Sequence, residues 1–359
     1  MITRRSVWAY RTAAFALALS VVVACNDDTT GVQQEPLTPD NASEVMNGVV
    51  TTFFEGNDAA ISLEYFGDYI GMALGGGPAL APAGMNATSS AGWNHLVQNF
   101  APVLGVPANI PQLFQGTTFE WDTLEGGYIP TEREGASQNG VRFILYAVNP
   151  ITLQPVSPLN EVGYIDLIDT SSFPTVALDM AAVIGEDTLI SVGATGTLSD
   201  TLVTFNIDGY FSNGQDQLDF TLDASDSDDG TTIIDFQLEF DGYTAHHTWT
   251  ETQNGVTLEQ TLSDGVNEIA FQVDLLSNFG DYVIQEGSGV YFNDELVAAL
   301  SGTVGEDSWD VTLTNAEGDP LTPTELQALG EVFDVFAELN LFFNGMLNFA
   351  FSLVTIAVG

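Results

Sequence analysis

The chain has 359 residues, of which 49 are aspartate or glutamate, five are arginine and none is lysine. Binding to nucleic acid or to an anionic lipid surface needs clustered cations, and phosphate-handling enzymes normally place lysine or arginine beside the anion, so this composition argues against all three classes. Hydrophobic residues make up 45% of the chain and include 23 phenylalanines, which is enough for a large core and argues against disorder.

The first segment of the chain carries a targeting pattern. Its positive residues are Arg4, Arg5 and Arg11. An apolar run over 13–23 follows, and the segment closes on Val22-Val23-Ala24-Cys25, which contains the only cysteine. This order resembles a bacterial lipoprotein signal peptide with its lipobox. The resemblance implies cleavage after residue 24, a diacylglyceryl thioether on the Cys25 sulfur and an acylated new N-terminus.

Lipidation implies a place in the cell envelope. Each buried methylene contributes about 0.8 kcal/mol, so two or three acyl chains would hold the protein on a membrane almost permanently. Asn26 follows the cysteine, whereas aspartate at that position favours inner-membrane retention in the best-studied bacteria with two membranes. We therefore expect export and a lipid anchor in the outer rather than the inner membrane. Residues 25–37 form the expected lipidated tether, which is polar beyond Cys25 and flexible.

The chain after Cys25 is strongly acidic. Two arginines against 49 carboxylates give it a formal net charge of −47. The composition resembles that of proteins from salt-adapted organisms, in which high ionic strength screens the self-repulsion. Surface binding of divalent cations is the alternative interpretation. We favour the salt interpretation, because the carboxylates are dispersed along the chain rather than gathered in spaced ligand loops.

Residues 38–104 have helical patterning. Thr38-Pro39-Asp40 is typical of a helix start, with a capping hydroxyl followed by proline at the first helical position. A second helical stretch over Ala59–Leu74 ends at a run of three glycines and a proline. Trp93–Leu104 is a candidate for one further short helix.

From Thr117 the hydrophobic period changes from about 3.6 to 2, which predicts strands over 117–314. Polar side chains alternate with apolar ones, and glycine-containing turns separate the runs, as in an antiparallel meander with one covered face. About a dozen strands would curl, so a strongly bent half-barrel or a barrel is expected. The candidate strands are Thr117–Thr123, Val141–Val148, Glu161–Asp169, Leu202–Phe211, Leu218–Leu222, Ile234–Phe240, Thr244–Thr250, Val256–Leu262, Ile269–Leu275, Tyr282–Gln285, Val290–Phe292 and Trp309–Thr314.

A capping box, Thr322-Pro323-Thr324-Glu325, predicts the start of a C-terminal helix over 323–356. Residues 339–359 carry no charge, and we weigh a buried core helix, a terminal strand and a membrane span. The predicted fold class is α+β, with a single domain over 38–359. The N-terminal and C-terminal helices would cover the apolar face of the sheet.

Two groups of polar residues are candidates for ligand binding. Asn340, Asn344 and Asn348 are spaced to form one stripe on a helix. The stripe would face water or satisfy backbone groups at the rim of the sheet, or else form the polar wall of a ligand channel. Arg142 alternates with apolar residues in a strand and would pair with a neighbouring carboxylate, or else recognise an anionic ligand. Arg133 is the only other cation after the signal segment.

Catalytic and metal motifs are not evident. His246 and His247 are adjacent in a strand, so their side chains would point to opposite faces, and His95 has no obvious partner. The aspartates before Gly230 do not have EF-hand spacing, which favours a solvated loop and leaves weak calcium binding as the alternative. These aspartates are Asp223, Asp226, Asp228 and Asp229. Asp122 beside Trp121 is only a coincidental hint of glycoside hydrolysis.

The sequence predicts a non-enzymatic, lipid-anchored envelope protein that binds or organises an envelope component. We expect this protein to need no cofactor, and weak binding of Ca²⁺ by the aspartates before Gly230 is the alternative. The second hypothesis is a carrier or receptor for an apolar ligand, because a bent sheet covered by helices is similar in outline to the lipoprotein-carrier half-barrel. The third is an envelope hydrolase. A carrier would need an apolar cavity under the helices, whereas an interaction domain would have a filled core.

Overall fold

The computed structural model describes residues 110–356, except for 111, 148–154, 173, 200, 213, 215, 279–280 and 306–308. The signal segment, Cys25, the tether, His95 and the helices expected within 38–104 lie outside the described residues.

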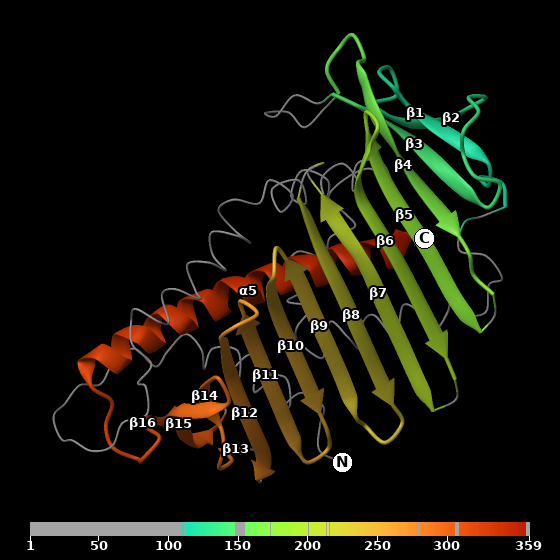
Figure 1. Ribbon diagram of the computed structural model, residues 1–359. Helices are drawn as coiled ribbons and strands as arrows, with labels where there is room; N and C mark the ends of the chain where they lie inside the picture. The colour runs from blue at the N-terminus through green and yellow to red at the C-terminus, as the bar shows by residue number, and fades with distance from the viewer. Residues whose placement is uncertain are drawn as a thin grey trace. The chain divides into compact units, whose positions relative to one another are not determined.

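The described chain has the expected α+β fold class, an antiparallel meander with a C-terminal helix (Figure 1). Its sheet has 16 strands and its helix is α5 (Pro323–Ile356). The strands are β1 (Thr117–Asp122), β2 (Gly127–Thr131), β3 (Gly140–Tyr146), β4 (Glu161–Asp169), β5 (Thr175–Ile184), β6 (Asp187–Leu198), β7 (Leu202–Ser212), β8 (Gln217–Ser227), β9 (Thr232–Phe240), β10 (Tyr243–Glu251), β11 (Gly255–Ser263), β12 (Glu268–Asn278), β13 (Asp281–Ile284), β14 (Gly289–Phe292), β15 (Glu295–Val304) and β16 (Trp309–Asn315).

The order of strands in the sheet follows the chain from β3 to β12, each strand beside the next. At one end, β1 pairs in parallel with β3 and antiparallel with β2. At the other end, β13 and β14 both lie between β12 and β15, each covering a different part of β12. They therefore act as one interrupted strand, and β16 continues the meander on the far side of β15.

The described residues form two compact units that divide within β8, between Asp223 and Ala224. Strands β1 to β7 belong to the N-terminal unit, and β9 to β16 belong to the C-terminal unit together with α5 as far as Gly345. Residues from Met346 onward group with the N-terminal unit.

The core of the N-terminal unit follows from strand alternation. Side chains at every second position of β4, β6 and β7 are almost fully buried, as Ile165, Ile190 and Ile207 illustrate. The rings of Phe211 and Phe220 stack with their centroids 5.1 Å apart. The outward positions of β7 and β8 are mostly polar, which is the pattern expected for a sheet with one covered face.

In the C-terminal unit, α5 covers the inward face of strands β9 to β12. Phe333 meets Phe271 of β12 with a centroid distance of 5.6 Å, and ten residues later Phe343 meets Phe236 of β9 at 4.5 Å. The helix therefore crosses these strands one after another along its length (Figure 1). Its buried face is formed by Ala328, Leu329, Val332, Phe333, Val335, Phe336, Leu339, Asn340 and Phe343.

The start of α5 shows the expected capping box. The backbone N–H of Thr322 donates to Glu325 Oε2 at 2.7 Å, and the N–H of Glu325 donates to Thr322 Oγ1 at 3.3 Å. The helix continues to Ile356. The interpretation of 339–359 as a terminal strand is therefore wrong for residues 339–356. No helix in the described part of the chain combines the length and apolar character needed to cross a bilayer.

Candidate functional site

Both arginines that follow the signal segment lie in the N-terminal unit, on and beside β3. Arg142 of β3 faces Asp166 of β4 across the strand pair. Its Nε donates to Asp166 Oδ1 at 2.7 Å and its Nη2 donates to Oδ2 at 2.6 Å. The guanidinium carbon also lies 3.7 Å from the ring centroid of Tyr164. The planar fork of Arg142 is thus occupied by an internal carboxylate and stacked on an aromatic ring.

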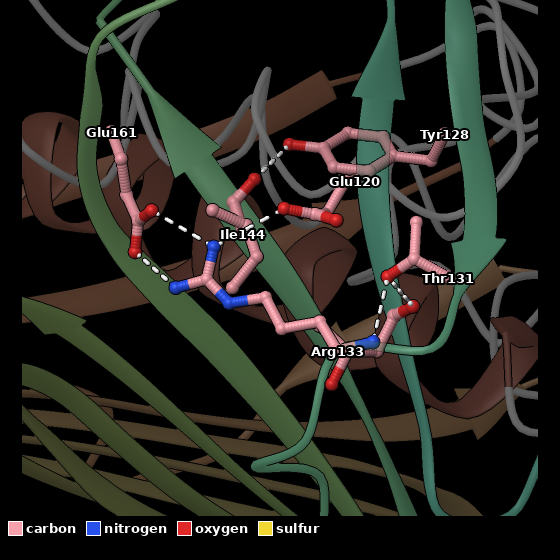
Figure 2. Close-up of polar contacts among 7 residues, drawn as sticks. Glu120, Tyr128, Thr131, Arg133, Ile144 and Glu161 are labelled. Atoms are coloured by element: carbon pink, nitrogen blue, oxygen red, sulfur yellow. Dashed lines mark hydrogen bonds and ion pairs between the residues drawn. The ribbon is translucent and has the colours of Figure 1, made fainter.

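Arg133 follows β2 and ties three segments together (Figure 2). Its Nη1 and Nη2 donate to the two carboxylate oxygens of Glu161 at 2.9 and 2.7 Å. Nη1 also donates to Glu120 of β1 at 3.2 Å. The Arg133 side chain is 39% exposed, so solvent screens this pair far more than it screens the pair formed by Arg142.

These contacts stabilise the charged forms of their members. The hydrogen bond with Arg133 lowers the pKa of Glu161, and the same bond raises the pKa of the Arg133 guanidinium. The hydrogen bond with Asp166 likewise raises the pKa of Arg142. The arrangement can hold β1, β3 and β4 in register. Recognition of an anionic ligand by Arg142 stays a prediction, and such a ligand would have to displace Asp166.

A second polar cluster lies under α5 in the C-terminal unit. It joins His247 of β10, Gln260 of β11 and Asn340 of α5, whose side chains are buried among apolar ones. Gln260 Nε2 lies 2.9 Å from His247 Nδ1 and donates to Asn340 Oδ1 at 2.7 Å. We call these three residues the α5 polar chain.

The protonation state of His247 follows from its partners. Because an amide nitrogen only donates, Nδ1 must accept, which places the ring proton of the neutral histidine on Nε2. Burial lowers the pKa of His247 to about 4, and the charge of His246 acts in the same direction. His247 is therefore neutral at physiological pH. Its ring packs against Phe343 with a centroid distance of 5.4 Å.

His246 points to the opposite face of the sheet, as its adjacency to His247 predicts. Its Nε2 lies 3.0 Å from Asp235 Oδ2, and Thr248 Oγ1 donates to the same oxygen at 3.0 Å. A histidine that activated the threonine would contact the carboxylate through one ring nitrogen and the hydroxyl through the other. Here both contacts involve Nε2, so the three side chains do not form a nucleophile–base–acid relay.

Asn340 corrects the simpler interpretation of the asparagine stripe. Its side chain is 7% exposed and accepts a hydrogen bond from the buried Gln260, so it does not face water. Satisfaction of backbone groups by the stripe stays a prediction. The side chains of Asn344 and Asn348 lie outside the described residues. A ligand channel along the stripe stays a prediction.

The aspartates proposed as calcium ligands form separate hydrogen bonds with different neighbours. Asp223 accepts from Asn206, and Asp226 accepts from Thr232, each at 2.9 Å. Asp229 accepts from Ser227 and from the backbone of Thr231, and the hydrogen bond from Ser227 lowers its pKa. Asp228 is exposed. Among the residues that the structure describes, no three His, Cys, Asp or Glu side chains are placed to hold a metal ion.

Other carboxylates show local roles. Asp122 Oδ1 accepts from the backbone N–H groups of Leu124 and Glu125, so it caps the turn between β1 and β2 rather than acting with Trp121. Asp179 and Asp208 flank Gly193, and a Cβ on that glycine would lie 3.5 and 3.6 Å from their Oδ1 atoms. Burial and then the charge of Asp208 raise the pKa of Asp179.

Sequence reasoning missed the role of Gln260, although a signal for it is present. In β11 the inward positions are Val256, Leu258, Gln260 and Leu262, so a glutamine interrupts an otherwise apolar series. A buried glutamine needs partners, which points to a second polar side chain on whatever covers the strand. The sequence could not show that the partner is Asn340, eighty residues away.

Comparisons with protein-family models, with curated proteins and with solved structures found no match.

Proposed function

We propose that this protein is a lipid-anchored lipoprotein of the cell envelope whose β-sheet domain binds or organises an envelope component without catalysis. The observation that carries the proposal is the segment Val22-Val23-Ala24-Cys25, in which the only cysteine of the chain follows a positive and then an apolar stretch. The outer membrane is the proposed location, because Asn26 rather than aspartate follows the cysteine.

The polar side chains of the described residues support a non-catalytic role. The guanidinium groups of Arg133 and Arg142 are hydrogen-bonded to carboxylates of the same chain, and His247 is buried under α5. His246 meets Asp235 in a geometry that does not activate Thr248. Catalysis needs a reactive group held beside an accessible substrate position, and none of these arrangements offers one.

The packing under α5 supports surface binding over the carrier hypothesis for the C-terminal unit. Rings of the helix contact rings of the sheet directly, as Phe343 does with Phe236 and Phe333 does with Phe271. An apolar ligand would have to displace these contacts, whereas outward side chains of the strands are half-buried or exposed among the described residues. That face carries carboxylates such as Glu259 and Asp274, so it suits a partner with basic or neutral polar groups.

Cys25→Ser tests the anchor. We expect loss of the acyl mass from the mature protein and release into the soluble fraction, because serine cannot form the thioether. Intact-mass analysis of protein purified from native membranes, with metabolic labelling by a palmitate analogue, provides the measurement. Continued labelling of Cys25→Ser would overturn the proposal.

Asn26→Asp is the matched variant for location. It keeps Cys25 and changes only the next side chain, so acylation should persist while the protein moves from the outer to the inner membrane on a density gradient. An unchanged distribution would contradict the role given to Asn26 and leave the lipid anchor itself unaffected.

A further inference from the structure

We propose that Asn254, in the turn between β10 and β11, is a site of spontaneous deamidation, and that the fold protects the same local sequence at Asn139. The modification is a reaction of the chain with water. It does not depend on the lipid anchor or on an envelope partner.

The comparison is possible because one tetrapeptide occurs twice. Gln-Asn-Gly-Val stands at 138–141 and again at 253–256. In both places the glycine is the first residue of a strand, Gly140 in β3 and Gly255 in β11. Asparagine before glycine is labile, because no side chain hinders the approach of the glycine nitrogen to the asparagine amide. Since the reacting atoms and their nearest neighbours in the chain are identical, a large difference in rate must come from the fold.

Both glycines are required by the packing of adjacent strands. A Cβ on Gly140 would lie 2.3 Å from the carbonyl oxygen of Leu167, and a Cβ on Gly255 would lie 2.0 Å from that of Leu275. Another residue at either position would force the neighbouring backbone to move. Protection against deamidation therefore has to come from the surroundings of the asparagine.

Asn139 is held at both ends of its side-chain amide. Ser137 Oγ donates to Asn139 Oδ1 at 2.7 Å, and Asn139 Nδ2 donates to the carbonyl oxygen of Asp169 at 2.6 Å. The nitrogen that would attack belongs to the buried Gly140, and it donates to the carbonyl oxygen of Ser137 at 3.0 Å. Rotation of the Asn139 amide towards that nitrogen would break both side-chain bonds, so deamidation is disfavoured here.

Asn254 is tied to its surroundings differently. The hydrogen bonds that the described residues give it are made by its backbone: its N–H donates to Thr252 Oγ1 at 3.2 Å, and its carbonyl oxygen accepts from the N–H of Ser277 at 2.7 Å. Asn254 is exposed and Gly255 is half-buried. The N–H of Gly255 donates to the Thr252 hydroxyl at 3.2 Å. The amide of Asn254 can therefore rotate towards Gly255 at a lower cost than the amide of Asn139 can rotate towards Gly140.

The reaction uses only the chain and water. The nitrogen of Gly255 attacks Cγ of Asn254, the new N–Cγ bond replaces the Cγ–Nδ2 bond, and ammonia leaves with the proton from Gly255. Water then opens the five-membered succinimide. Opening at Cγ gives aspartate, and opening at the backbone carbonyl carbon gives isoaspartate. Either product adds a carboxylate to the turn.

The isoaspartyl product also changes the backbone. It lengthens the chain by one methylene immediately before β11, where Gly255 pairs with Leu276 of β12. The carbonyl of Asn254 that accepts from Ser277 becomes a free carboxylate, and the chain continues through Cγ instead. Deamidation at this turn should therefore loosen the contact between the start of β11 and the end of β12.

Peptide mapping of the full mature chain after incubation at mildly alkaline pH tests the proposal. Digestion after glutamate and arginine gives peptides 252–259 and 135–142, each with a single asparagine. We expect peptide 252–259 to gain the mass of an amide-to-acid change about tenfold faster than peptide 135–142 or more, because the bonds of Asn139 must break first. Labelling by an isoaspartyl methyltransferase identifies the isoaspartyl product.

Incubation in urea is the control for intrinsic reactivity, and there the two peptides should react at similar rates. Asn254→Gln should remove the gain in 252–259 and leave 135–142 unchanged, because the longer side chain forms the six-membered ring slowly. Ser137→Ala should speed the reaction of Asn139, since it removes the hydroxyl bonded to Oδ1. Equal rates at the two sites in the native chain would overturn the proposal, as would an Asn254 that reacts in urea but not in the native chain.

Discussion

At the residue scale, the two arginine pairs differ in burial, and their contributions to stability should differ accordingly. Arg142 and Asp166 are 21% and 18% exposed and form two short parallel hydrogen bonds, whereas Arg133 and Glu161 are 39% and 43% exposed. Exposed ion pairs contribute little, because water and salt screen them. A partly buried, bidentate and stacked pair also depends on the shape of the guanidinium.

Arg142→Lys should therefore lower the free energy of unfolding by about 1 to 2 kcal/mol, because lysine keeps the charge but loses the planar fork and the contact with Tyr164. Arg133→Lys is the matched control and should cost less than about 1 kcal/mol. Urea unfolding midpoints of the two variants provide the comparison. A cost for Arg133→Lys equal to that of Arg142→Lys would show that burial does not distinguish the pairs.

The α5 polar chain is the other notable feature at this scale. It carries a cost in folding stability, and it also bears on how α5 is positioned on the sheet. A buried polar atom without a partner costs about 1 to 3 kcal/mol, and Gln260 Oε1 is such an atom among the described residues. Against that cost, we expect the hydrogen bond with Asn340 to oppose sliding of α5 along its apolar face and so to favour one register of the helix on the sheet.

At the scale of elements, α5 depends on one broad apolar face. A helix of 34 residues would be marginal alone, and its stability comes from the rings and aliphatic side chains that it buries on the sheet. Phe336 is 1% exposed and lies near Phe271 of β12. Two residues earlier, Asp334 points to solvent.

Phe336→Ala should cost about 3 to 5 kcal/mol in chemical unfolding, because it removes a buried ring and leaves a cavity between helix and sheet. Asp334→Ala, on the exposed side of the same helical turn, should change stability by less than about 0.5 kcal/mol. If both substitutions had small effects, α5 would not be packed on the sheet in solution as it is in the structure.

Three of the strands that the sequence did not reveal, β2, β5 and β15, are also explained at this scale. β5 and β15 contain Leu178, Met180, Ala181, Leu296, Ala298 and Leu300, residue types that favour helices in isolation. β2 contains Pro130, which is compatible with its position at the edge of the sheet beside β1 but weakens a local strand signal. Pairing with neighbouring strands overrides these preferences, and it is not visible in a local window.

At the scale of the whole molecule, the dominant property is charge. No lysine or arginine follows Arg142. In the described C-terminal unit the charged side chains are therefore carboxylates, and the two histidines are the other titratable basic groups. The carboxylates are spread over strands and turns and are not gathered into ligand sets in the described residues. Mutual repulsion therefore opposes folding across the molecule, and it is weakened by screening.

Melting temperature should accordingly rise as NaCl increases from low concentration to about 1 M, where the Debye length is only about 3 Å. Calorimetry in NaCl and in millimolar CaCl₂ separates the two interpretations of the acidic composition. General screening predicts a gradual rise with NaCl and little effect of dilute calcium. A steep rise with dilute calcium, and none with NaCl, would favour specific divalent sites over salt adaptation.

Features that depend on neighbouring residues could be predicted from the sequence. Alternation revealed the meander and the opposite orientations of His246 and His247, and the capping box at Thr322 marked the start of α5. These features are readable because hydrogen bonding and side-chain direction repeat over two to four residues.

Which distant residues meet became visible only in the folded chain. Nothing local indicates that β1 inserts between β2 and β3, that Asp166 takes the fork of Arg142, or that Gln260 bridges His247 and Asn340. Such pairings depend on strand order and on where a helix crosses a sheet, which are set by burial summed over the whole core. The chemistry of the buried histidine therefore became visible only once the covering helix was in place.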